Sequence, residues 1–152
     1  MFHKVQAVQP CEEYYLLVWF DDGSIKEYDL TPAMRTWKQF KALKDRTLFK
    51  KVHVDAGGYG ISWNDKLDLA GNELYDNGRN VDPCATAKKL ILDSVAATRK
   101  EQGMSQAQLG RASGVQQPAV ARLEKGESSP QLDTLLKVLA PLGKTLAVVD
   151  IA

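Results

Sequence analysis

The stretch Ser105–Gly126 decides the fold of the second half of the chain, and its sequence is SQAQLGRASGVQQPAVARLEKG. Ser105 can cap a short helix, and Gly114 stands where that helix must end in a tight turn. A second short helix follows and ends before Gly126. Two helices that cross at a sharp angle need a small residue where they meet, which is Gly110 here. The spacing therefore predicts two short helices joined by a tight turn.

The segments on both sides of this stretch also have helical patterns. The spacing predicts a preceding helix from Thr86, as its cap, to about residue 102, and a following helix opened by the pair Ser129-Pro130. The expected buried stripes of these two helices are Leu90, Ile91, Val95 and Thr98 in the first, and Leu132, Leu135, Leu136 and Leu139 in the second. The last apolar run, Thr145–Ile151, is β-branched and predicts a strand.

The aromatic residues divide the chain into two parts. All 12 Phe, Trp and Tyr residues precede residue 76, whereas the apolar residues beyond it are Leu, Val, Ile, Ala and Met. Two cores of such different composition indicate two separately packed domains. Residues 76–83 are rich in turn formers. The sequence thus predicts a domain over residues 1–78, a linker over 79–85 and a helical domain over 86–152.

The first domain has strand patterns followed by a helical one. Tyr14–Phe20 reads as a buried strand, residues 21–24 as a hairpin turn, and Ile25–Leu30 as the returning strand. A three-residue spacing of large apolar residues then predicts a helix facing a core; they are Met34, Trp37, Phe40 and Leu43. A second hairpin is expected over residues 51–63. The fold class is therefore α+β: antiparallel strands with one or two helices, followed by an all-α domain with a C-terminal β-strand.

The Ser105–Gly126 stretch resembles the helix-turn-helix of the phage-repressor-like (Xre/Cro type) bacterial regulators, and the similarity extends over about residues 86–143. This resemblance implies a lambda-repressor-like fold whose recognition helix enters the major groove of DNA. Gln116, Gln117 and Arg122 would then face base edges. Glutamine can pair with adenine and arginine with guanine through two hydrogen bonds each, so these residue types suit direct readout.

The same resemblance implies roles for four further residues. Gln106, at the start of the first helix of the motif, and Ser128, after the second, would contact phosphates. Arg99 and Glu124 would form a structural ion pair that ties the preceding helix to the recognition helix.

The first half of the chain is similar to a small bacterial family of unknown function. The similarity covers about residues 3–78, through the stretches LLVWFDDGSIKEYDL, FKKVHVDAGGYGISW and DLAGNELYDNG. Members of that family often lie beside, or are fused with, components of the toxin–antitoxin type. The resemblance implies an interaction or sensing role and no defined chemistry.

The composition sets limits on other functions. The chain has 152 residues, of which 44% are hydrophobic, and a net charge of +1. No apolar run reaches the ~18 residues of a membrane span, and the N-terminus lacks a signal-peptide core. Cys11 and Cys84 are isolated, which favours a cytoplasmic protein without a metal site. No set of acid, base and nucleophile is visible, so we expect no enzyme, no cofactor and no membrane partner.

The sequence predicts a cytoplasmic, DNA-binding transcriptional regulator, with the antitoxin that represses its own operon as the preferred role and a toxin as a possible partner. The alternative is a repressor whose first domain senses a small ligand; an enzyme centred on that domain is disfavoured. From Val81 onward the chain has nine Lys or Arg against seven Asp or Glu, which is only mildly basic. We therefore expect a homodimer on a pseudo-palindromic operator of double-stranded DNA. The favoured way to build it is pairing of the C-terminal strand with the same strand of a second chain; the alternative partner of that strand is an edge of the N-terminal sheet.

Overall fold

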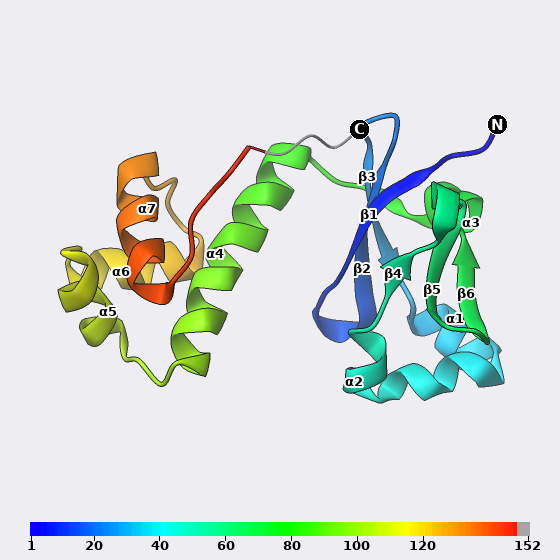
Figure 1. Cartoon of the computed structure of the whole chain (residues 1–152), viewed down its shortest axis with the longest axis horizontal. Coiled ribbons are helices and arrows are strands. Elements are labelled where there is room, and N and C mark those ends of the chain that lie inside the picture. The colour runs from blue at the N-terminus through cyan, green and yellow to red at the C-terminus, as the bar shows by residue number, and fades with distance from the viewer. Residues whose placement is uncertain (149–152) are drawn as a thin grey trace. The chain divides into compact units, whose positions relative to one another are not determined.

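A computed structural model describes residues 1–148 of the chain, which forms two compact units, one from Met1–Pro83 and the other beginning at Cys84 (Figure 1). Each unit has its own hydrophobic core. Of the residues expected as a linker, Arg79 and Asn80 form a short strand that pairs with the first unit, and Pro83 already begins a helix. The two units are described separately below.

The first unit contains two antiparallel sheets. The first sheet has the order β1-β2-β3-β7 and the second the order β4-β5-β6. The strands are β1 (Val5–Pro10), β2 (Tyr15–Phe20), β3 (Ile25–Asp29), β4 (His53–Val54), β5 (Gly60–Asn64), β6 (Leu67–Ala70) and β7 (Arg79–Asn80). Both predicted hairpins, β2–β3 and β4–β5, are confirmed. The sequence patterns do not predict β1, β6 or β7.

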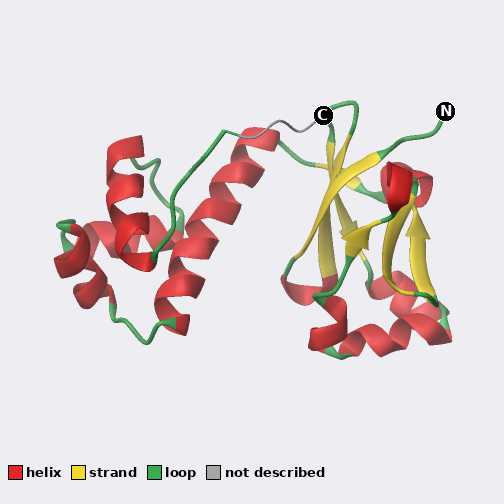
Figure 2. Cartoon of the chain, in the orientation of Figure 1, coloured by secondary structure: helices red, strands yellow, loops and turns green. Residues whose placement is uncertain are grey.

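Short helices complete this unit. They are η1 (Glu12–Tyr14), α1 (Thr31–Thr36), η2 (Lys38–Lys44), α2 (Arg46–Phe49), η3 (Ala56–Gly58) and α3 (Gly71–Asn77), where η denotes a 3₁₀-helix. α1, η2 and α2 lie together across one end of the strands (Figure 2). The three-residue spacing of the apolar residues predicted a single helix. That prediction was wrong, because the backbone of Trp37 is extended and separates α1 from η2. Trp37 is also 45% exposed, so it does not belong to the buried stripe.

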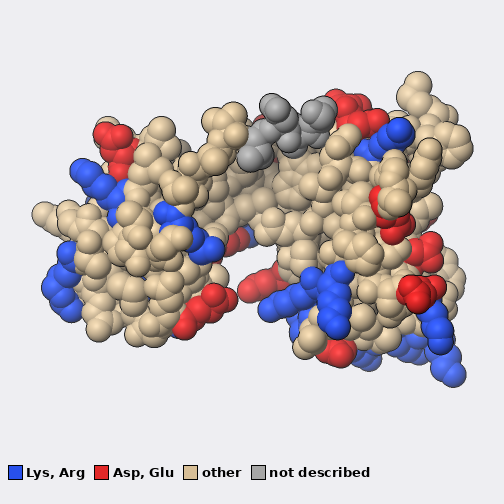
Figure 3. Space-filling view, viewed as in Figure 1, with Lys and Arg blue, Asp and Glu red and all other residues tan. Residues whose placement is uncertain are grey.

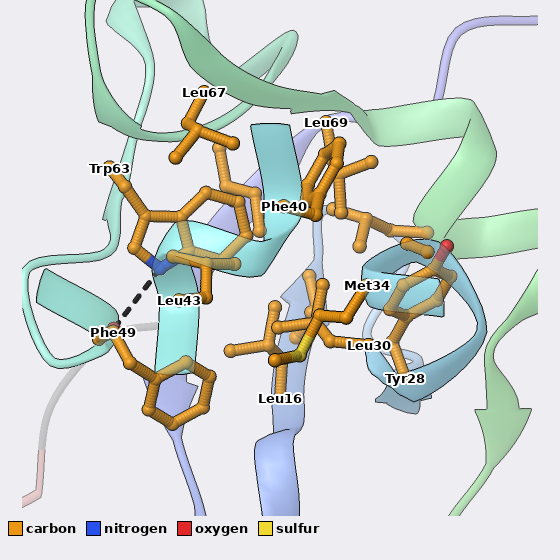
Figure 4. Close-up of a cluster of buried hydrophobic side chains, with 14 of the residues drawn as sticks. Leu16, Tyr28, Leu30, Met34, Phe40, Leu43, Phe49, Trp63, Leu67 and Leu69 are labelled. Carbon is orange, nitrogen blue, oxygen red and sulfur yellow. Dashed lines mark hydrogen bonds between the residues drawn. The ribbon is translucent and has the colours of Figure 1, made fainter. Parts of the chain in front are cut away.

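The core of the first unit joins both sheets to these helices. Leu16 on β2, Phe40 and Leu43 on η2, and Trp63 on β5 are all buried in it (Figure 4). The indole Nε1 of Trp63 donates a hydrogen bond to the backbone oxygen of Phe49, at 3.1 Å. The buried indole thereby fixes α2 against the second sheet without leaving its donor unsatisfied.

The second unit is helical throughout its described elements, as predicted. It consists of α4 (Pro83–Glu101), α5 (Gln106–Ser113), α6 (Gln117–Lys125), α7 (Leu132–Leu139) and η4 (Ala140–Leu142). Its core contains Leu92 and Val95 of α4, Leu109 of α5, and apolar residues of α6, α7 and η4. Helices α5 and α6 form the predicted pair joined by a tight turn.

Several details of the flanking helices differ from the expectations. Thr86 is buried inside α4 rather than capping it, because the helix begins at Pro83. Leu92 is buried on α4, whereas Ile91, expected in the stripe, is only partly buried. α7 begins at Leu132 rather than at Ser129-Pro130, and the side chain of Leu132 is 62% exposed.

The C-terminal segment was expected to form a strand over Thr145–Ile151. Residues 144–148 have no regular secondary structure, and residues 149–152 lie outside the described part of the chain. Leu146 packs against the core of the helical unit, whereas Val148 is fully exposed. The described part of the segment is therefore not a strand.

Candidate nucleic-acid interface

Local sequence signals fix both ends of α5. The Ser105 side chain accepts a hydrogen bond from the backbone N–H of Gln108, at 3.0 Å. The Gln108 side chain accepts one in return from the backbone N–H of Ser105, at 2.7 Å. This reciprocal capping box satisfies two backbone donors at the helix start. At the other end Gly114 has a φ of 74°, the left-handed conformation that glycine adopts without a steric cost.

The two helices of the motif approach each other closely at Gly110. A Cβ atom built on Gly110 would lie 2.7 Å from the backbone oxygen of Val115. The absence of a side chain at this position therefore lets α5 pack directly against the turn. Leu109 on α5 and Val120 and Leu123 on α6 are buried beneath the crossing and hold the angle between the helices.

The three residues that the resemblance assigns to base edges lie at the start of α6 and along it. Gln116 is the N-terminal flanking residue of α6, and Gln117 begins the helix. Both side chains are exposed, and so is that of Arg122. A hollow of about 350 Å³ adjoins the two glutamines at the turn, with Gly110, Arg111 and Val115 among the residues that line it. The α6 N-terminus thus presents polar side chains beside a concave surface.

A chain of hydrogen bonds connects the buried side of α6 to its exposed N-terminus. The ion pair expected between Arg99 and Glu124 is present, with Arg99 Nε 2.5 Å and Arg99 Nη2 3.0 Å from the two carboxylate oxygens. Gln106 Nε2 donates to Glu124 Oε2 at 2.9 Å. Gln117 Nε2 donates in turn to Gln106 Oε1 at 3.0 Å. Gln106 therefore links the ion pair to a residue of the candidate recognition surface.

The resemblance implies only a phosphate contact for Gln106 and does not predict this link. Its side chain is partly buried and bonds on both sides to protein groups. The signal that could have revealed the link is the position of Gln106 in the first turn of α5, which the tight turn brings next to the first turn of α6. Ser128 lies after α6 and is exposed, as a phosphate contact requires.

The electrostatics of the ion pair follow from its surroundings. Burial raises the pKa of Glu124, but hydrogen bonds from Arg99 and Gln106 and the positive charge of Arg99 outweigh it, so that the pKa is lowered overall. The hydrogen bond to Glu124 raises the pKa of Arg99. Arg99 Nη1 also donates to the backbone oxygen of Met104 at 2.7 Å. Both members are thus held in their charged forms.

A pH dependence of stability follows from the lowered pKa of Glu124. A carboxylate with a lower pKa in the folded state stabilises the fold above its unfolded pKa, and this stability is lost as the pH falls through the folded pKa. We expect the helical unit to lose stability below about pH 4. Urea unfolding followed by helical circular dichroism at a series of pH values measures this. Glu124→Gln, which cannot ionise, should show a shallower loss; an identical pH profile would contradict the prediction.

The described residues contain neither a candidate metal cluster nor a candidate membrane span. Across residues 1–148, no group of three or more His, Cys, Asp or Glu side chains is arranged to hold a metal ion. No helix in the same range has the length and apolar character needed to cross a membrane. Asp22, in the turn between β2 and β3, accepts hydrogen bonds from the backbone and the side chain of Ser24 and from the Tyr75 hydroxyl.

The two halves of the chain match two different family models. Residues 95–149 match a family model described as helix-turn-helix. Residues 5–80 match the family model of a protein of unknown function, DUF2442, which spans half of the chain. An uncharacterized HTH-type transcriptional regulator of Haemophilus influenzae is 46% identical over 92 residues, covering 60% of this chain and 88% of that protein.

Two solved structures are also similar. A chain of a toxin–antitoxin module from Streptococcus pneumoniae is 44% identical, covering 54% of this chain and 81% of its own, with a TM-score of 0.40. A crystal structure of a protein from Nitrosomonas europaea is 18% identical and covers 91% of this chain and 86% of its own, with a TM-score of 0.45. The chain therefore belongs to the helix-turn-helix transcriptional regulators and carries, in its N-terminal half, a domain of the DUF2442 family.

Proposed function

We propose that the chain regulates transcription by reading a specific operator sequence with the N-terminal part of α6. The observation that carries the proposal is that Gln116, Gln117 and Arg122 are all exposed, at or on a helix that the buried Arg99–Glu124 ion pair ties to α4. Glutamine offers a donor and an acceptor to adenine, and arginine offers two donors to guanine. DNA contact requires the protein to be in the cytoplasm with the DNA, which is the location we expect.

The hydrogen bond between Gln106 and Gln117 supports this assignment. An exposed glutamine samples many rotamers, and ordering it on DNA costs conformational entropy. In the free protein the hydrogen bond from Gln117 to Gln106 already restricts the Gln117 side chain. Less conformational entropy is therefore lost when Gln117 binds DNA. Gln106, at the N-terminal end of α5, and Ser128 are proposed to contact phosphates on either side, since backbone N–H groups at a helix start also attract anions.

Selection from a random duplex library with the full chain tests the proposed function. We expect a pseudo-palindromic sequence to be enriched, with half-site centres about one DNA turn, ~34 Å, apart. The enriched duplex should bind about 10³-fold or more tightly than a scrambled one at physiological salt. Recovery of unrelated sequences with equal affinities would contradict sequence-specific regulation.

A homodimer is part of this proposal. Leu132 and Val148 are exposed apolar residues of the helical unit, and association would remove them from water. The strand expected to build the dimer, Thr145–Ile151, lies partly outside the described residues. Dimerisation would place two copies of α6 on the two half-sites of one operator.

Removing residues 148–152 tests the dimer while keeping Leu146, which packs against the core. We expect the shortened chain to sediment as a monomer and to bind the operator much more weakly, because one α6 then reads only one half-site. Sedimentation velocity and DNA titration measure both properties. An unchanged dimer of unchanged affinity would contradict a contribution of these residues.

The preferred biological role is an antitoxin that represses its own operon and binds a toxin. Two features support it: the resemblance of residues 3–78 to a family often found beside toxin–antitoxin components, and a first unit with its own core, separate from the helical unit that we assign to DNA. Expression of the adjacent gene with and without this chain tests the role. Growth arrest that co-expression relieves is expected; a harmless neighbouring gene would favour the ligand-sensing repressor instead.

A further inference from the structure

The first unit contains a basic pocket that the proposed DNA-binding function does not use. Its volume is about 420 Å³, within the range of small-molecule sites. Its lining residues are Tyr14, Thr31, Met34, Arg35, Lys41 and Lys44. They come from η1, α1 and η2, so three elements of the fold converge on it. Lys and Arg side chains gather over this end of the unit (Figure 3).

The 3₁₀ geometry of η2 explains the basic rim. A 3₁₀-helix has three residues per turn, so residues three apart lie in one row. Phe40 and Leu43 form the buried row, whereas Lys41 and Lys44 lie in an exposed row. Arg35 on α1 is the third cation of the lining, and no Asp or Glu belongs to it. Within residues 1–148, none of these three cations takes part in an ion pair.

The rest of the lining is apolar or aromatic. Met34 is only 7% exposed, and the partly buried Tyr14 ring packs edge-on against Phe49 with centroids 5.5 Å apart. The Arg46 guanidinium lies 5.1 Å from the Tyr14 ring centroid, which adds a further cation near this wall. The backbone of Tyr14 has a φ of 64°, unfavourable for a tyrosine. The surrounding packing therefore holds this ring at the pocket against a local backbone preference.

We propose that this pocket binds a small organic molecule with at least two negative charges and a planar apolar group, the chemistry of a nucleoside diphosphate. The anionic groups would lie between Arg35, Lys41 and Lys44, where charge-assisted hydrogen bonds form. The planar group would cover Met34 and the Tyr14 ring. The phosphates of a DNA duplex lie on a convex ridge and would leave this apolar part of the pocket uncovered. Binding at this pocket is independent of the proposed operator binding.

Calorimetric titration of the full chain with three probes tests the proposal. ADP carries both features, pyrophosphate only the charge, and adenosine only the planar group. We expect ADP to bind one molecule per chain, at least about tenfold more tightly than either pyrophosphate or adenosine. Absence of ADP binding, or equal binding of ADP and pyrophosphate, would overturn the proposal.

Two matched triple variants separate the pocket from the general charge of the domain. Arg35→Gln/Lys41→Gln/Lys44→Gln removes the three lining cations. Lys50→Gln/Lys51→Gln/Lys66→Gln removes three exposed cations of the first unit that do not line the pocket. We expect the first variant to weaken ADP binding at least about tenfold and the second to change it less than about threefold.

Both triple variants are expected to fold, since all six side chains are exposed, and thermal unfolding checks this. Equal losses of ADP affinity in the two variants would show that only the overall positive charge of the unit attracts the nucleotide. That result would overturn the proposed binding site. Operator binding measured on the same proteins is independent of this result. A failure of the pocket and a failure of the DNA-binding proposal are therefore distinguishable.

Discussion

Glu124→Ala is expected to lower the free energy of unfolding of the helical unit by about 3–5 kcal/mol. The side chains of Arg99 and Glu124 are 11% and 8% exposed, so their mutual hydrogen bonds replace most of their contact with water. Without Glu124, the Arg99 charge is left largely buried without its counter-charge, and Gln106 loses its acceptor. Urea unfolding of the full chain, followed by helical circular dichroism, measures the change.

The double variant separates the ion pair from the packing of its members. Arg99→Ala/Glu124→Ala should cost less than the sum of the two single variants, because no buried charge then remains without a partner. Lys89→Ala provides a control, since the Lys89–Asp93 pair is 76% and 58% exposed; its removal should cost less than about 1 kcal/mol. Strict additivity of the Arg99 and Glu124 variants would contradict a coupled pair.

Gln117→Ala and Arg122→Ala are each expected to weaken binding to the selected operator by about 1–3 kcal/mol, which is roughly 5- to 150-fold. Each variant removes a side chain that we assign to one base edge and leaves the buried residues Val120 and Leu123 in place. Titration of labelled duplexes measures the specific and the scrambled sequence side by side. The affinity for scrambled DNA should change much less than the affinity for the operator.

Lys137→Ala is the matched control for Arg122→Ala. Lys137 is also an exposed cation of the helical unit, but it lies on α7 rather than on α6. Removing it should alter operator affinity only through the general charge. Equal effects of Lys137→Ala and Arg122→Ala would show that the charge of Arg122, rather than its position on α6, matters for binding.

The helical unit was largely predictable because its signals are local. Ser105, Gly114 and Gly126 mark helix ends through capping and left-handed backbone conformations, which depend on residues close in sequence. The elements and their order followed from these signals. The start of α4 did not, since Thr86 is a good capping residue that tertiary packing buries inside the helix instead.

The first unit was less predictable because its elements depend on distant residues. β7 pairs with β3 across about fifty residues of sequence, and Gly58 lies against the backbone of Val5. The three-residue spacing that predicted one α-helix also fits the 3₁₀-helix η2, whose period is three. Trp37 follows the three-residue spacing but lies in the break between α1 and η2. The periodicity of the apolar residues does not reveal that break.

The residue types of the candidate site were predictable from the sequence, but the hydrogen bonds between those residues were less predictable. Exposed Gln116, Gln117 and Arg122 followed from the resemblance and from the periodicity of α6. The bond from Gln106 to Gln117 depends on how closely α5 approaches the turn. The close approach is possible because Gly110 has no side chain. How close the two segments come depends on three-dimensional packing, which the sequence does not give.

Removing one acceptor atom from the operator tests whether Gln117 reads a base edge. Replacing single adenines by 7-deazaadenine deletes N7, to which a glutamine side chain donates. At one position in each half-site we expect this change to weaken binding of the parent chain and to have no further effect on Gln117→Ala. An equal loss for both proteins at every adenine would contradict base reading by Gln117.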